Sequence, residues 1–231
     1  MRCLIVFTLL LTSCGGGGNG GTDNNITSPP PTPPVLNEVC IDYAERIKRC
    51  SFEWDNIQRT YYLKIPLQAS NNNNLPLLIS MHGYGGNALS HINYTNFKNI
   101  ADREGFYLIY PQGSNLPSYL GGSTHWNVGG WTSKSTTDDL GFINKVLENV
   151  AEKYNFNENR IYATGMSNGG YMSYALACNM SDKIAAIASV TGSMTNDTYN
   201  DCAATRPVPV LQIHGLRDLI VPYLGNEGSK S

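Results

Sequence analysis

The chain has 231 residues and a formal net charge of −2, with 15% charged and 41% hydrophobic residues. These values fit one or two packed globular domains, and the near-neutral charge lacks the basic character of a nucleic-acid-binding protein. The polar residues are mainly Asn, Ser, Thr, Tyr and Gly, which suits uncharged, hydroxyl-rich partners such as polysaccharides.

The first residues predict export. Arg2 gives a positive start, and residues 4–11 form an apolar stretch too short to span a bilayer permanently. The stretch ends in Leu11-Thr12-Ser13-Cys14, which resembles a bacterial lipobox. We therefore expect a signal peptide over residues 1–13 and a lipid anchor on Cys14, at the outer membrane or cell surface. The alternative is an ordinary secretory signal with a chance cysteine.

Residues 14–37 are expected to form a tether, because their Gly, Asn, Thr and Pro residues cannot bury enough apolar surface to fold. The folded domain is expected over residues 38–231. Four cysteines fall inside it, and in an exported chain they predict disulfides. Nearness in sequence favours Cys40–Cys50 and Cys178–Cys202 among the three possible connectivities. No cysteine or histidine cluster indicates a metal, and no cofactor is expected.

Strand and helix patterns alternate along this domain. Strands are expected at residues 59–65, 77–81, 106–110, 160–164 and 208–213, with a further apolar run at 184–190. Helical spacing covers residues 94–101 and 138–154, and a helix is expected over 168–178. The alternation predicts an α/β fold with a mainly parallel sheet covered by helices on both faces.

The strongest chemical motif is Gly165-Met166-Ser167-Asn168-Gly169, between an expected strand and an expected helix. In that context G-x-S-x-G predicts a nucleophile elbow, a sharp turn that presents the serine hydroxyl above the sheet. Ser167 is therefore the candidate nucleophile. The amide of Asn168, at the start of the helix, is a candidate donor to an oxyanion. The alternative is a glycine-rich turn without chemistry.

Two further loops follow expected strands. His82-Gly83-Tyr84-Gly85-Gly86 comes after residues 77–81, where a hydrolase needs a second oxyanion donor, and the backbone N–H of Tyr84 is the candidate. His82 is interpreted as a structural residue of that loop. Asp218 lies in the loop after residues 208–213 and is the candidate acid that orients a histidine, or else a surface turn residue. His214 is also interpreted as structural.

Five segments together carry a resemblance. HGYGGNA, YPQG, DDLGFI, GMSNGG and HGLRDLIVPY resemble the secreted feruloyl esterases and polyhydroxybutyrate depolymerases, over about residues 56–223. The resemblance implies the α/β-hydrolase fold and cleavage of esters, often those that decorate plant polysaccharides. Asp138 and Asp139 are expected to cap and position a helix. Trp126 and Trp131 flank a glycine-rich loop and are expected either to line an aromatic acyl pocket or to pack.

The chain departs from this family at the catalytic histidine. The family's histidine follows the acid by some tens of residues, but residues 219–231 contain no histidine. The sequence therefore predicts an esterase domain that is incomplete at its C-terminal end and also lacks a last strand and helix. The alternative is that His125 serves as the base. His91, the other upstream histidine, falls before the first expected helix.

The leading hypothesis is an exported serine carboxylic-ester hydrolase, similar to feruloyl esterases, that acts on polysaccharide-linked hydroxycinnamate esters through an acyl-enzyme. A polyhydroxyalkanoate depolymerase, with a polyester substrate, is the alternative enzyme. A truncated, inactive lipoprotein that only binds glycan is the alternative of another class.

Overall fold

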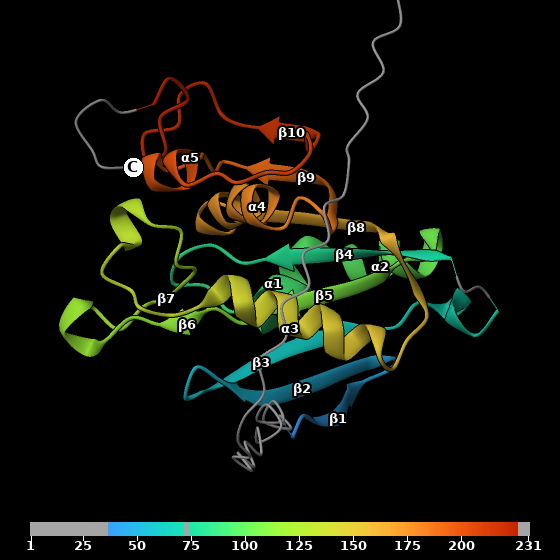
Figure 1. Cartoon of the computed structure of the whole chain (residues 1–231). Helices are drawn as coiled ribbons and strands as arrows, with labels where there is room; N and C mark the ends of the chain where they lie inside the picture. The colour runs from blue at the N-terminus through green and yellow to red at the C-terminus, as the bar shows by residue number, and fades with distance from the viewer. Residues whose placement is uncertain (1–36, 72–73, 226–231) are drawn as a thin grey trace, which may run out of the picture. The chain divides into compact units, whose positions relative to one another are not determined.

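The computed structural model describes residues 37–71 and 74–225. The predicted signal peptide, Cys14 and nearly all of the predicted tether lie outside these residues. The largest sheet has eight strands in the order β1-β2-β3-β5-β4-β8-β9-β10 (Figure 1). Its strands are β1 Val39–Ala44, β2 Ile47–Trp54, β3 Ile57–Lys64, β4 Leu75–Met81, β5 Tyr107–Pro111, β8 Phe156–Met166, β9 Ile184–Val190 and β10 Val210–Ile213.

The predicted mainly parallel α/β sheet is confirmed. Strands β5, β4, β8, β9 and β10 run parallel to one another. Strands β1, β2 and β3 form an antiparallel extension, in which β3 pairs antiparallel with β5. A separate small sheet pairs β6 Ser114–Asn115 with β7 Thr124–His125. Of the three strands in this extension, only β3 was predicted.

Helices cover both faces of the large sheet. The helices are α1 Ala88–Thr95, α2 Phe97–Glu104, α3 Asp139–Ala151, α4 Asn168–Asn179 and α5 Asn196–Asn200. Side chains of α3 and α4 pack in one apolar cluster with Leu77 and Ile79 of β4, and those of α1 and α2 pack in the other with Leu108 of β5. Alternate strand residues therefore point to opposite helical layers.

Two residues with left-handed backbone conformations, Asn96 and Gly105, end the helices between β4 and β5. Helical spacing predicts one helix over residues 94–101, but Asn96 has a φ of 55° and separates α1 from α2. This left-handed conformation ends the first helix, and asparagine tolerates it better than most residues. Gly105, the predicted stop, has a φ of 74° and ends α2.

The β10 edge leaves apolar surface uncovered in the described part of the chain. All four residues of β10 are exposed, with Leu211 at 58%. In the loop that follows, Leu219 is 91% exposed and Ile220 is 87% exposed. Among the helices that the structure describes, none has both the length and the apolar character needed to cross a membrane.

Both predicted disulfides are present. Cys40 of β1 and Cys50 of β2 lie directly opposite each other, with Cα atoms 4.0 Å apart. Cys178 of α4 is bonded to Cys202, which follows α5, with Cα atoms 4.8 Å apart. The second bridge fixes the short helix α5 to the helix that begins beside Ser167.

Removing the Cys178–Cys202 bridge should destabilise the fold. We expect the Cys178→Ala/Cys202→Ala variant to lose about 2–4 kcal/mol of unfolding free energy, because an open chain has more conformational freedom when unfolded. Urea unfolding of the oxidised protein measures the loss, and non-reducing peptide mapping identifies the bridge. Free thiols at both positions in protein from an oxidising compartment would refute the pairing.

Candidate active site

Ser167 lies in the sharp turn between β8 and α4, as expected for a nucleophile elbow. Its backbone has φ 52° and ψ −120°, a strained conformation for a residue other than glycine. The two flanking residues are glycines because neighbouring backbone atoms leave no space for a Cβ atom. A Cβ at Gly169 would lie 2.4 Å from the carbonyl oxygen of Met81, and one at Gly165 would lie 2.2 Å from that of Gly169. The turn therefore holds a partly exposed serine at the carboxyl end of the central strand β8.

The loop after β4 packs directly against this serine. A Cβ placed on Gly83 would lie 3.5 Å from the Cβ of Ser167. In the same loop, the amide of Gly85 donates to Thr124 O at 2.8 Å and that of Gly86 to Gly83 O at 3.0 Å. Among the described residues, the amides of Tyr84 and Asn168 donate to no acceptor. Two free donors beside one serine are what an oxyanion hole needs.

His82 holds the oxyanion loop rather than carrying chemistry. Its Nδ1–H donates to Gly83 O at 2.8 Å, and its Nε2 accepts from the amide of Gly113 at 3.0 Å. The ring is 2% exposed, and burial lowers its pKa. With both nitrogens engaged, the neutral ring ties the loop after β4 to the segment after β5, in agreement with the structural interpretation.

Asp218 is presented as a charged carboxylate in the loop after β10. Its Oδ1 accepts from the amides of Val221 and Ile220, each at 2.9 Å, and these bonds lower the pKa of Asp218. Burial raises the pKa of Tyr171, in the first turn of α4, and the negative charge of Asp218 raises it further. The charge of Asp218 therefore reaches Tyr171 of α4, and its role as the acid stays a prediction.

None of the chain's four histidines forms a hydrogen bond with the hydroxyl of Ser167. His214 Nε2 donates to Val221 O at 2.7 Å and lies 3.7 Å from Asp218 Oδ2, which fits the structural interpretation of this residue. His91 Nε2 is 3.0 Å from Ser80 Oγ. Among the described residues, no histidine is therefore hydrogen-bonded to Ser167 as its base.

His125, the alternative base, is fully buried. Its Nδ1–H donates to Ser114 O at 3.0 Å, and its Nε2 has no hydrogen-bond partner among the described residues. Burial lowers the pKa of the ring, so it remains neutral at neutral pH. The structure does not bring this histidine to Ser167.

The two tryptophans proposed for the acyl pocket have different positions. Trp126 is 0% exposed, and its indole N–H donates to His82 O at 2.8 Å. Its backbone exchanges two hydrogen bonds with the side chain of Asn168, at 2.7 and 3.0 Å. Trp126 therefore has the packing role that the sequence left open, and it orients the start of α4.

Trp131 instead lies at the surface of the site. It is 44% exposed, and its ring centroid is 5.3 Å from that of Tyr84 and 6.3 Å from that of Tyr171. Asp197 of α5 accepts a hydrogen bond from the amide of Gly130 at 2.6 Å, next to Trp131. The bridged helix α5 therefore anchors the segment that carries Trp131, which forms an aromatic cluster with Tyr84 of the oxyanion loop and Tyr171 of α4. Neither Tyr84's ring nor Tyr171 was predicted in this role.

Asp138 and Asp139 position α3, as predicted, but in different ways. Asp138 is the N-cap and accepts from the amide of Gly141 at 2.8 Å. Asp139 is fully buried and pairs with Arg59 of β3 at 2.6 Å, while its other oxygen accepts from the amide of Asn127 at 2.7 Å. The pair therefore links the sheet extension to the loop that carries Trp126. Sequence analysis missed Arg59, because its partner is 80 residues away.

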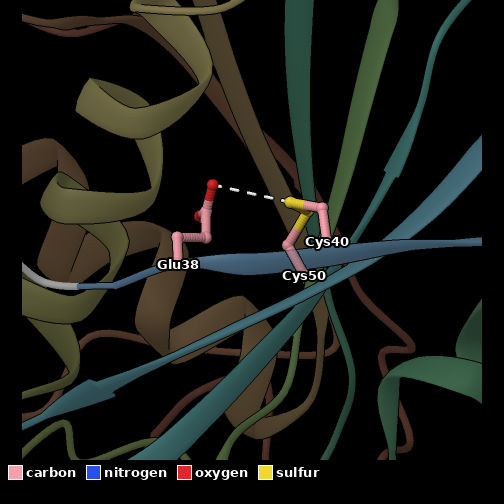
Figure 2. Close-up of side chains that lie close together, drawn as sticks. All are labelled: Glu38, Cys40 and Cys50. Atoms are coloured by element: carbon pink, nitrogen blue, oxygen red, sulfur yellow. Dashed lines mark hydrogen bonds between the residues drawn. A yellow bond between two sulfur atoms is a disulfide. The ribbon is translucent and has the colours of Figure 1, made fainter.

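Glu38, Cys40 and Cys50 form a compact group of donor atoms within 4.8 Å of one another (Figure 2). The two sulfurs are consumed in the disulfide, and a carboxylate oxygen of Glu38 lies 3.5 Å from Cys40 Sγ. The same carboxylate accepts from Tyr61 at 2.8 Å and Asn149 at 2.9 Å. This group therefore joins β1 and β3 to α3 and leaves no thiolate for a metal.

Buried His91 should make stability depend on pH. Burial lowers its folded-state pKa from 6.5 to about 4, so the unfolded chain binds a proton first as the pH falls. The stabilisation from burying neutral His91 is complete above pH 6.5 and is lost as the pH falls to 4, a loss of roughly 3 kcal/mol. We expect urea unfolding at pH 7 and pH 4.5 to differ less for His91→Gln than for the wild type. Equal differences would contradict the prediction.

Comparison with known proteins decides the family. Residues 65–230, most of the chain, match the family model described as phospholipase/carboxylesterase. The chain belongs to the phospholipase/carboxylesterase family. A serine nucleophile is typical of this family.

Curated relatives of this carboxylesterase-family chain carry esterase names. It is 30% identical to the bifunctional acetylxylan esterase/xylanase XynS20E of Neocallimastix patriciarum, over 67% of the chain and 21% of the relative. It is 30% identical to feruloyl esterase C of Emericella nidulans, over 72% of the chain and 57% of the relative. For feruloyl esterase B of Piromyces equi the identity is 28%, over 72% and 30%. The chain therefore spans less than two thirds of each of these relatives.

Solved structures show that the carboxylesterase-family chain has the fold of known esterases. A thermostable esterase superposes with a TM-score of 0.58 at 18% identity, over 78% of this chain and 49% of that one. A ferulic acid esterase superposes with a TM-score of 0.51 at 17% identity, over 68% and 65%. The predicted α/β-hydrolase fold is thereby confirmed.

Proposed function

We propose that this chain carries the catalytic site of an exported carboxylic-ester hydrolase that acts on hydroxycinnamate esters linked to polysaccharide. The observation that supports the proposal most strongly is the strained Ser167 beside the free amides of Tyr84 and Asn168. Relatives named feruloyl esterase support a hydroxycinnamate ester, and the relative named acetylxylan esterase supports only an ester on a polysaccharide. The exposed rings of Tyr84 and Trp131, which is backed by the buried Tyr171, suit a flat phenolic acyl group.

The proposed chemistry is acyl transfer through Ser167. A base removes the hydroxyl proton as the serine oxygen attacks the ester carbonyl, and the amides of Tyr84 and Asn168 stabilise the oxyanion. Collapse releases the sugar alcohol and leaves an acyl-serine, which water then hydrolyses to the free acid. In this scheme Asp218 orients a base that the described contacts do not supply, and no metal or cofactor takes part.

Methyl ferulate tests this function because it contains the acyl group without the polysaccharide. We expect slow hydrolysis that depends on Ser167, and negligible release of hydroxyacid from a polyhydroxybutyrate film. A Ser167→Ala variant is the control for background hydrolysis. Release from the film that exceeds turnover of methyl ferulate would favour the polyester depolymerase instead, and binding without any Ser167-dependent turnover would favour an inactive lipoprotein.

We also propose that the mature protein begins at a lipid-bearing Cys14, with residues 14–37 as its tether. The lipobox-like residues before Cys14 support this, and the two disulfides suit an oxidising compartment. Mass spectrometry of the mature protein should find an acylated N-terminal Cys14, and a Cys14→Ala variant should leave the membrane fraction. An unmodified N-terminus at another residue would contradict the anchor.

A further inference from the structure

A cavity of about 570 Å³ opens beside the active site, at the boundary between the large sheet and the small sheet. One wall is the start of β3, with Ile57, Gln58 and Thr60, and another is the segment that follows β5, with Asn115. Asn87 also lines the cavity and directly follows Gly86 of the oxyanion loop. Its volume lies in the usual range for small-molecule sites, about 300–1,000 Å³.

Several polar side chains of the cavity have hydrogen-bonding capacity to spare. In residues 37–71 and 74–225, the side chains of Gln58, Thr60 and Asn115 form no hydrogen bond. Asn87 uses its carbonyl oxygen to accept from the amide of Ser90 at 2.8 Å, and its amide group has no acceptor. A ligand with many hydroxyl groups, each both donor and acceptor, satisfies such a mixed set.

The cavity is electrically neutral. Arg59 is the one ionisable residue in its lining, and Asp139 neutralises it at 2.6 Å behind the wall. Arg59 is 2% exposed, and its Nη1 has no hydrogen-bond partner in the structure. A charged ligand would gain no free counter-charge here, whereas a neutral ligand can bond to amides and hydroxyls.

The position of the cavity matches one end of an ester substrate. In the sheet, β5 and β8 flank β4, so β5, whose following loop lines the cavity, and β8, which ends next to Ser167, are two strand spacings, or about 10 Å, apart. The aromatic cluster depends on α5, which follows β9 on the other side of β8 (Figure 1). The oxyanion loop therefore carries one ring of the aromatic cluster, Tyr84, and leads directly into Asn87 of the neutral, polar cavity.

We propose that this cavity is a glycosyl subsite, which binds uncharged sugar residues of the polysaccharide whose ester Ser167 attacks. The inference rests on the proposed function and extends it to the alcohol side of the substrate. The acyl group lies against Tyr84 and Trp131, and the sugar lies over Gln58, Thr60 and Asn115. Hydrogen bonds from these side chains would then place the ester bond over Ser167.

Isothermal titration of the full chain with an unesterified arabinoxylo-oligosaccharide tests the subsite without needing catalysis. We expect binding by the wild type and at least a tenfold weaker Kd for Gln58→Ala/Asn115→Ala, since each variant side chain loses its bonds to the sugar. Asn93→Ala removes a matched exposed amide on α1, outside the cavity, and should bind like the wild type. Thermal unfolding checks that all three proteins fold.

The outcomes separate this proposal from the function on which it rests. Wild-type chain that binds no oligosaccharide, or a double variant that binds as well as the wild type, would overturn the subsite. So would stronger binding of an acidic oligogalacturonate than of the neutral oligosaccharide. Ser167-dependent hydrolysis of methyl ferulate, which has no sugar, reports separately on the proposed esterase chemistry.

Discussion

With p-nitrophenyl acetate, the 231-residue chain is expected to turn over far below the usual enzymatic range of ~1–10³ s⁻¹. All four histidines are engaged away from Ser167 or buried, so its proton has no positioned acceptor among the described residues. An esterase site without one triad member retains about 10³–10⁴-fold catalysis over water, from the oxyanion hole and binding alone. We expect Ser167→Ala to abolish this remaining activity.

Free imidazole sharpens this assay, because it can act from solution as the base that the described contacts do not place beside Ser167. The rate of the wild type should rise with imidazole concentration more steeply than the rate of Ser167→Ala, which measures hydrolysis by imidazole itself. Wild-type turnover in the range of ~1–10³ s⁻¹ without imidazole would contradict the prediction. Loss of that turnover in His125→Ala would identify His125 as the base.

Asp139→Ala is expected to destabilise the fold by about 3–5 kcal/mol, because it leaves the buried charge of Arg59 without a partner. The same change removes the acceptor for the amide of Asn127. Its neighbour offers a matched control. Asp138→Ala deletes an exposed helix cap and should cost only about 0.5–2 kcal/mol.

Equilibrium urea unfolding of the wild type and the two aspartate variants measures both losses. Replacing the whole pair, as Arg59→Met/Asp139→Leu, should cost less than Asp139→Ala, since no unpaired charge remains buried. Equal losses for Asp138→Ala and Asp139→Ala would show that the ion pair contributes no more than a cap. A double variant as unstable as Asp139→Ala would point to lost packing instead.

Features that depend on neighbouring residues could be predicted from the sequence. The elbow at Ser167 needs only a strand, two small residues and a helix, and the cap at Asp138 needs only the first turn of α3. The alternation of apolar runs likewise predicted β4, β5, β8 and β10, and an apolar run marked the position of β9. These elements contain their own signals, so the fold class and the sharp turn at Ser167 followed from short segments.

Features that depend on distant partners were not predictable. β1 is mostly exposed, so it carries no buried apolar pattern to mark it as a strand. The burial of Trp126 depends on Asn168 and on His82, which are 42 and 44 residues away. The aromatic cluster and the neutral cavity likewise combine residues from separate loops. Spacing along a sequence gives residue types for such sites but not their neighbours in space.

The central claim is that Ser167 is the nucleophile of an esterase site. Tryptic peptide mass spectrometry after treatment with a fluorophosphonate tests it most directly. We predict one adduct, on the peptide spanning residues 161–183, with fragmentation placing it on Ser167 rather than on Ser173 or Ser181. The adduct should be absent from Ser167→Ala. No adduct after prolonged excess reagent, or an adduct on a different serine, would contradict the account.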